Sequence, residues 1–269
     1  MTKPSALTFA PTLLNTRPSH QAQALTELLL QQGFEVLDCP TLHIQPMSLP
    51  ADAKQDWRQF DKVFFISQNA VTHFVQQWQK LTDSKPVFYP HQIGYAIGQA
   101  TYKAMRAQKW PVKKGVHGKA FVTESLLASS ELQDLSGQRC LIIKGQAGRD
   151  ALANGLRTAG AKVTEWALYQ RQSMPLCVDA WHLFQQAAHP VVLATSLSSI
   201  DALLQALPVL TGQKKHQAWL FLQPIIVFSD RIKTQLQDLG WQGRIWVVPE
   251  QSNQGILSVM KQLQQEQSP

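Results

Sequence analysis

The sequence predicts an α/β fold with two similar flavodoxin-like domains, each built on a doubly wound parallel sheet. This fold is indicated by an internal repeat, by short apolar segments that alternate with amphipathic helices, and by polar turns after those segments. The chain has 269 residues, of which 44% are hydrophobic and 16% are charged. This length and this apolar content suffice for two folded cores.

The internal repeat brings three segments of the first half back in the second half, in the same order. Its offset is 127 residues at the start and rises only to 131 at the end, so few insertions separate the copies. A repeat of this length indicates two copies of one supersecondary arrangement. The equivalent positions are Leu14 and Leu141, Gly33 and Gly160, Val63 and Val192, and Ile97 and Phe228.

Within each copy, an apolar strand leads into an amphipathic helix. Residues 63–66 form a continuous apolar run, as expected of a strand that is covered on both faces. Ser67 follows and is suited to cap a helix whose apolar residues, Val71, Phe74 and Trp78, recur at helical spacing. Strands and helices that alternate at this spacing favour parallel sheets with right-handed crossovers.

The turns at the carboxyl ends of the predicted strands share one chemical character. They contain hydroxyl, amide, glycine and basic residues and almost no carboxylates, in a chain with a formal net charge of +7. Because the free N–H groups of helix N-termini attract anions, these turns suit a ligand with several carboxylates or phosphates. Simple helix capping is the alternative for each turn. The turns are residues 16–19, 67–69, 98–101, 144–149, 195–198 and 229–231.

Several kinds of chemistry are not indicated. The chain has no G-x-x-x-x-G-K-[ST] phosphate loop, no G-x-S-x-G nucleophile elbow and no H-E-x-x-H zinc motif, so we expect no metal and no cofactor. Cys39, Cys140 and Cys177 are far apart, which fits buried, reduced thiols in a cytoplasmic protein. The N-terminus lacks an apolar signal region, and no apolar run could span a bilayer. The positive charge is dispersed, so neither a membrane nor a nucleic acid is expected as partner.

The strands and the turns after them resemble those of uroporphyrinogen-III synthases over nearly the whole chain. No single motif is diagnostic, but the order and spacing of the segments are together specific. The segments that carry the resemblance are LNTRP from residue 14, FISQNAV from residue 65, AIGQAT from residue 96, LIIKG from residue 141, GAKV from residue 160 and LYQR from residue 168.

The resemblance implies a hydro-lyase that needs no cofactor and acts on hydroxymethylbilane, a linear tetrapyrrole with many carboxylates. Such an enzyme expels the terminal hydroxyl as water and closes the ring through a spiro intermediate, which inverts ring D and gives uroporphyrinogen III in haem biosynthesis. Spontaneous closure gives isomer I, so catalysis depends mainly on positioning. The resemblance further implies a cytoplasmic monomer with a transient contact to the preceding enzyme of the pathway.

The resemblance also implies that one domain is inserted into the other. Residues 1–38 and 173–269 would form the first domain, and residues 45–164 would form the second. Residues 39–44 and 165–172 would be the linker strands, and the cleft between the domains would hold the active site.

Tyr169 is the catalytic residue that the resemblance implies, because a linker tyrosine of the family assists departure of the hydroxyl, and a phenol is a suitable weak acid. A tyrosine that merely packs is the alternative. The last turn, from Ser229 to Ile232, departs from the glycine- and threonine-rich turn of the family. The residues expected to bind substrate are Thr16, Arg17, Ser67, Asn69, Gly98, Thr101, Lys144, Gly145, Ser196, Ser198 and Ser229.

Two other functions compete with this one. A non-catalytic two-domain binding protein for an anionic metabolite would use the same polar turns, although the missing signal peptide counts against a solute receptor. A regulatory or interaction module derived from the synthase is the other, and the presence of Tyr169 counts against such a decayed copy.

Overall fold

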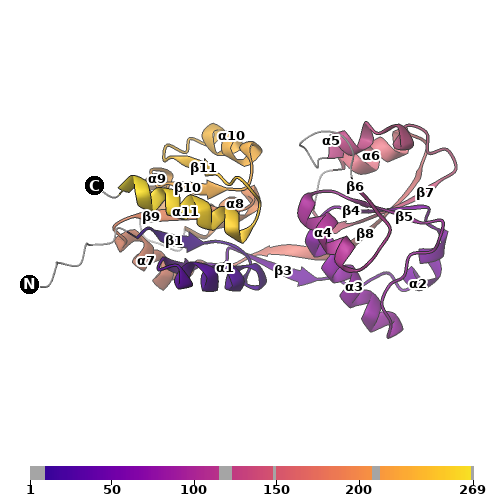
Figure 1. Cartoon of the computed structure of the whole chain (residues 1–269), viewed down its shortest axis with the longest axis horizontal. Helices are drawn as coiled ribbons and strands as arrows, with labels where there is room; N and C mark the ends of the chain where they lie inside the picture. Colours follow the sequence, from indigo (N-terminus) through magenta and orange to yellow (C-terminus); the bar gives the residue numbers. More distant parts are fainter. Residues whose placement is uncertain (1–9, 115–122, 148–149, 208–212, 268–269) are drawn as a thin grey trace, which may run out of the picture. The chain divides into compact units, whose positions relative to one another are not determined.

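The computed structural model describes residues 10–114, 123–147, 150–207 and 213–267 (Figure 1). The chain divides into two compact units: unit 1 contains Met1–His43 and Gln172–Pro269, and unit 2 contains Ile44–Arg171. The chain passes between the units within strands β3 (Leu42–Pro46) and β8 (Lys162–Ser173), which are hydrogen-bonded neighbours. These strands overlap the two segments expected to be linkers, residues 39–44 and 165–172.

Unit 1 is built on a five-stranded sheet in the order β11-β10-β9-β1-β2, and all of its neighbouring strands are parallel. Counted along this unit from the β2 edge, the order is 2-1-3-4-5, the flavodoxin arrangement. The strands are β1 (Thr12–Asn15), β2 (Glu35–Asp38), β9 (Pro190–Ala194), β10 (Ile225–Val227) and β11 (Ile245–Val247).

Helices cover both faces of the unit 1 sheet (Figure 1). Successive side chains of a strand point to opposite faces, so Leu13 packs with α1 (Ser19–Gln31) and α11 (Asn253–Gln267), whereas Leu14 packs on the other side. That second face is covered by α7 (Val178–Gln186), α8 (Leu197–Ala206), α9 (Gln213–Phe221) and α10 (Asp230–Asp238).

Unit 2 has a six-stranded sheet in the order β3-β8-β7-β4-β5-β6, and its strands are parallel from β8 to β6. Besides β3 and β8, the sheet contains β4 (Lys62–Phe65), β5 (Ile93–Ala96), β6 (Val112–Lys114) and β7 (Arg139–Gly145).

Two apolar clusters fill the faces of the unit 2 sheet. An aromatic core that includes Trp57, Phe74 and Trp166 lies on one face, and a largely aliphatic core lies on the other. The first face is covered by α2 (Ala53–Asp56), the 3-10 helix η1 (Trp57–Gln59), α3 (Gln68–Thr82) and α4 (Gln99–Ala107). The second is covered by α5 (Thr123–Leu127), η2 (Ser130–Leu132) and α6 (Ala151–Thr158).

The repeat in the sequence corresponds to a repeat in space. Strands β11, β10, β9, β1 and β2 of unit 1 have the same order as β6, β5, β4, β7 and β8 of unit 2. The two copies differ in where the chain enters the sheet, so one is a circular permutation of the other. The prediction of two similar doubly wound domains is therefore confirmed.

The structure also bears on the expectations about the cysteines and about membrane-spanning segments. All three cysteines are free, but only Cys39 and Cys140 are buried; Cys177 is half-buried because it precedes α7 at the rim of the core. No helix in the described part of the chain is long and apolar enough to cross a membrane. Residues 1–9 of the N-terminal segment and residues 148–149 of the turn 144–149 lie outside the described residues.

Candidate active site

The predicted site residues lie at the carboxyl edges of the two sheets. In unit 1 they follow β1, β9 and β10, and in unit 2 they follow β4 and β5 or end β7. Tyr169 lies within β8 of unit 2, where it is the register partner of Gly145. Because the carboxyl ends of parallel strands share one edge, each unit gathers its own group of polar turns.

Three serines cap the helices that begin at these edges. Ser67, Ser196 and Ser229 have extended backbones, and each side-chain oxygen accepts a hydrogen bond from the backbone N–H three residues on. This is the geometry of an N-cap, so the capping alternative is correct for all three. The other N–H groups of these first turns and the helix dipoles favour an anion nearby.

Arg17 is a half-buried cation at the edge of unit 1 that carries the polar turns. Its Nη1 donates to Asn253 Oδ1 at 2.8 Å, and its guanidinium lies 6.0 Å from the centre of the Phe228 ring. Its buried Nε has no hydrogen-bond partner, and no described carboxylate forms an ion pair with it. Burial lowers the pKa of Arg17, although arginine stays protonated in proteins. A partly desolvated cation with no ion-pair partner among the described residues is suited to bind a carboxylate of a ligand.

The chemical centre of unit 2 is a hydrogen bond between two hydroxyls. Tyr169 Oη lies 2.8 Å from Ser67 Oγ, which also accepts the N–H of Ala70 at 3.0 Å. Tyr169 is only 2% exposed, so its ring is fixed by packing. The pair joins a phenol, which is a weak acid, to the first turn of α3.

Gly145 and His73 enclose the ring of Tyr169. A Cβ atom at position 145 would lie 2.7 Å from Cε2 and 2.8 Å from Cζ of Tyr169, so only glycine leaves room for the ring. The His73 ring stacks on the Tyr169 ring with centroids 5.6 Å apart and an interplanar angle of 30°. Gly145 was expected to bind substrate, but its structural role is to admit the tyrosine.

Lys144 was expected to supply charge to the ligand. Its ammonium instead lies 2.6 Å from Glu165 Oε2 and 3.6 Å from Asp150 Oδ1. The hydrogen bond from Lys144, with further help from Arg157, lowers the pKa of Glu165. The charge of Lys144 is thus compensated within the protein by an ion pair between β7 and β8, and its expected contact with the substrate stays a prediction.

Two predicted hydroxyls point into the protein. Thr16 is fully buried and its Oγ1 donates to the carbonyl of Leu193, while Thr101 is 2% exposed and donates to the carbonyl of Ile97. Since a threonine has a single hydroxyl proton, neither side chain can donate to a substrate in this arrangement. In this arrangement the hydroxyls of Thr16 and Thr101 form structural hydrogen bonds, and their expected substrate contacts stay predictions.

The other predicted residues lie at or just before the first turns of helices. Gly98 precedes α4 with a φ of +93°, a conformation that favours glycine. Asn69 and Ser198 are half-buried in the first turns of α3 and α8. Within the described residues, no group of three or more histidine, cysteine, aspartate or glutamate side chains could hold a metal ion.

Comparison with known proteins decides the family. A family model described as uroporphyrinogen-III synthase HemD matches residues 23–258. The chain belongs to this family. Uroporphyrinogen-III synthase of Escherichia coli is 30% identical over 258 residues, which are 93% of this chain and 99% of that protein. The synthase of Salmonella typhimurium is 29% identical over 259 residues, with the same shares.

Solved structures of the uroporphyrinogen-III synthase family share the fold. A mutant uroporphyrinogen III synthase from Thermus thermophilus superposes with a TM-score of 0.64 at 14% identity and covers 95% of this chain and 100% of its own. The uroporphyrinogen-III synthetase of Helicobacter pylori reaches 0.59 at 14% identity, with the same shares covered.

Two residues that contact the predicted site residues were not predicted from the sequence of this uroporphyrinogen-III synthase family member. Asn253 begins α11, and its Oδ1 accepts a hydrogen bond from Arg17. The repeat offset rises along the chain, and one further increase of the same size pairs β6 with β11. That pairing would have located the turn before Asn253. His73 is a polar residue between the apolar Val71 and Phe74 of α3, which was the available signal.

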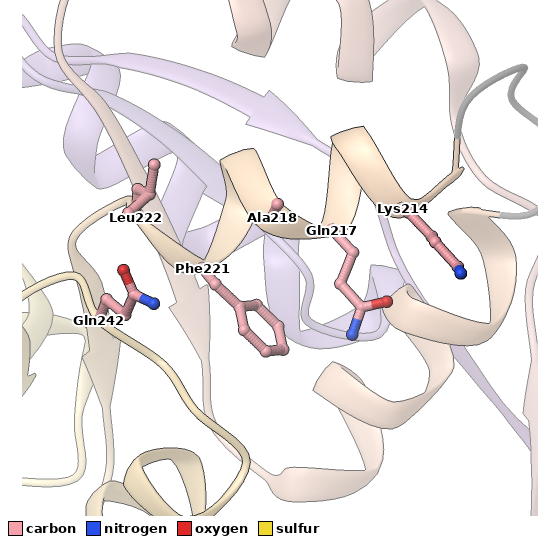
Figure 2. Close-up of a pocket in the computed structure, with 6 residues that line it drawn as sticks. All are labelled: Lys214, Gln217, Ala218, Phe221, Leu222 and Gln242. Atoms are coloured by element: carbon pink, nitrogen blue, oxygen red, sulfur yellow. The ribbon is translucent and has the colours of Figure 1, made fainter.

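A hollow beside α9 is separate from these turns. It has a volume of about 450 Å³, and Lys214, Gln217 and Phe221 project toward it from one side of α9 (Figure 2). Helix α9 leads into the amino end of β10, whereas the polar turns follow the carboxyl ends of the strands. None of the predicted site residues lines this hollow.

Proposed function

We propose that this chain converts hydroxymethylbilane to uroporphyrinogen III, with loss of water and inversion of ring D. Membership of the uroporphyrinogen-III synthase family supports the reaction. The structural observation that carries the proposal is the hydrogen bond of 2.8 Å between Tyr169 Oη and Ser67 Oγ. It holds a weak acid in one direction at the sheet edge where ligands of such folds bind.

Tyr169 assists departure of the terminal hydroxyl of the substrate. Ser67 Oγ already accepts the N–H of Ala70, and either hydroxyl of the Ser67–Tyr169 pair can donate to the other. When Ser67 donates to Tyr169, the phenolic proton is directed to the ligand. Its hydrogen bond to the leaving oxygen strengthens as the carbon–oxygen bond breaks and water departs, which lowers the barrier.

The polar turns hold the carboxylates of the substrate. Arg17 supplies a positive charge in unit 1, and the first turns of α3, α4, α8 and α10 supply backbone N–H groups. Holding the chain of pyrroles in one geometry favours closure at the substituted carbon of ring D, so positioning supplies much of the catalysis.

The reaction is that of a cytoplasmic hydro-lyase. Elimination of water followed by ring closure moves no electrons to or from the substrate, so it needs no redox cofactor. The sequence also has no readable metal-ligand motif, so activity is expected to survive exhaustive chelation. Loss of isomer III after chelation, restored by one particular metal, would contradict this part of the proposal.

The decisive experiment identifies the product. Freshly generated hydroxymethylbilane is mixed with a series of protein concentrations, the products are oxidised, and the porphyrin isomers are separated. We expect the share of isomer III to rise with protein concentration. Isomer I alone at every concentration refutes the proposal, and binding of the substrate without isomer III would favour the non-catalytic binding protein instead.

A further inference from the structure

In the described part of the chain, His73 is the one residue whose ring stacks on the ring of Tyr169. It is 9% exposed and lies on the buried face of α3, whose other buried residues are Ala70, Val71, Phe74 and Trp78. The stacked rings have centroids 5.6 Å apart at 30°, within the range of an attractive aromatic pair.

Helix α3 therefore contacts Tyr169 at two points. Its N-cap, Ser67, binds the hydroxyl, and His73, in the second turn, supports the ring. Strand β7 adds a third point, because the backbone of Gly145 lies against the same ring. A side chain that is held from one rigid helix and one rigid strand keeps a narrow range of orientations.

We propose that His73 is a positioning residue for the reaction: its imidazole supports the ring of Tyr169 and so sets where the phenolic hydroxyl points. The inference rests on the proposed function, in which that hydroxyl assists the leaving group. His73 acts through Tyr169 and does not touch the substrate.

The proposal makes the aromatic ring of His73 the essential feature. Phenylalanine at position 73 keeps a flat ring against Tyr169, whereas alanine leaves a gap into which the tyrosine ring can tilt. His73→Ala is therefore expected to lower kcat by between about twofold and tenfold, the range for loss of one aromatic stack, with little change in KM. His73→Phe should stay within about twofold of the parent.

The test is a double-mutant cycle with Tyr169→Phe, measured as kcat and KM for isomer III formation. If His73 acts through the hydroxyl, His73→Ala should slow the Tyr169→Phe enzyme by less than about twofold, because the hydroxyl that it positions is gone. An equal loss in both backgrounds, which a general packing role predicts, overturns the proposal. So does a parent-like His73→Ala, or a His73→Phe variant as slow as His73→Ala.

Thr72→Ala is the matched control, since Thr72 is exposed on the same helix. A readout without turnover is the ¹⁹F spectrum of protein labelled with 3-fluorotyrosine, in which Tyr169→Phe identifies the resonance of Tyr169. His73→Ala should move that resonance and Thr72→Ala should not; an unmoved resonance overturns the proposal. If the parent forms no isomer III, the proposed function fails, whereas the spectrum still tests the contact itself.

Discussion

Replacing Gly145 with alanine tests whether the place of the Tyr169 ring matters for catalysis. The added Cβ would lie 2.7 Å from Cε2 and 2.8 Å from Cζ of the ring. Carbon atoms in contact lie about 3.5–4.0 Å apart, so the ring must retreat by about 1 Å. Gly145 does not have a positive φ, so alanine introduces a steric conflict without backbone strain.

The retreat is large compared with the hydrogen bond that it disturbs. Tyr169 Oη lies 2.8 Å from Ser67 Oγ, and a shift of the ring that lengthens this distance by about 1 Å takes the pair out of hydrogen-bond range. Overpacking of this kind costs about 1–3 kcal/mol of stability. Misplacing a reacting group by about 1 Å can cost roughly 100-fold in rate, so we expect kcat to fall by about 10- to 100-fold. KM should change little, because Arg17 and the first turns of α3, α4, α8 and α10, which are proposed to bind the carboxylates, keep their sequences.

The assay compares isomer III formation by the parent, Gly145→Ala, Tyr169→Phe and the double variant, with circular dichroism to confirm folding. The double variant should be no slower than Tyr169→Phe. Gly155→Ala is the control, because its Cβ would overpack Leu127 on the opposite face of the same sheet. It should alter stability without altering kcat. A folded Gly145→Ala enzyme with the parent kcat would refute the reasoning.

Four further predictions concern other parts of the molecule. Ser67→Ala and Ser196→Ala each remove an N-cap, so each should lower the free energy of unfolding, measured by thermal unfolding, by about 1 kcal/mol. Only Ser67→Ala should also slow turnover strongly, because only Ser67 contacts Tyr169. Equal rate losses in the two variants would contradict this link. Arg17→Gln should raise KM by about tenfold or more, and Arg17→Lys should restore part of it; an unchanged KM would remove Arg17 from the site. Lys144 and Arg157 lower the pKa of Glu165 in the folded state. The ionised Glu165 therefore stabilises the fold at a pH above the ordinary carboxyl pKa of about 4.3, and this contribution is lost as the pH falls through the lowered pKa. Glu165→Gln should therefore be less stable than the parent at neutral pH, by less than about 1 kcal/mol, with a gap that closes in acid; a gap that widens in urea titrations at low pH would show the opposite sign. Burial raises the pKa of the Cys39 and Cys140 thiols to about 12, so iodoacetamide followed by peptide mass spectrometry should find Cys177 modified first, and equal labelling of Cys39 would be inconsistent with the fold.

The site could be predicted only in part from the amino-acid sequence. The serines at positions 67, 196 and 229 follow apolar strands, and this local pattern correctly placed them at helix starts. The same pattern could not show what else each residue touches. Thr16 and Thr101 look like ligand hydroxyls in the sequence, yet each donates its proton to a carbonyl within the protein.

The fold was predictable because its signals are local or repeated. Strand and helix periodicity depends on near neighbours in the chain, and the constant order of the repeat showed that one α/β arrangement occurs twice. The roles of Gly145, Lys144 and His73 required the folded structure. Gly145 and Lys144 meet their partners Tyr169 and Glu165 across a β-sheet pair, and His73 meets Tyr169 from a helix 96 positions earlier in the chain, where no sequence spacing records the contact.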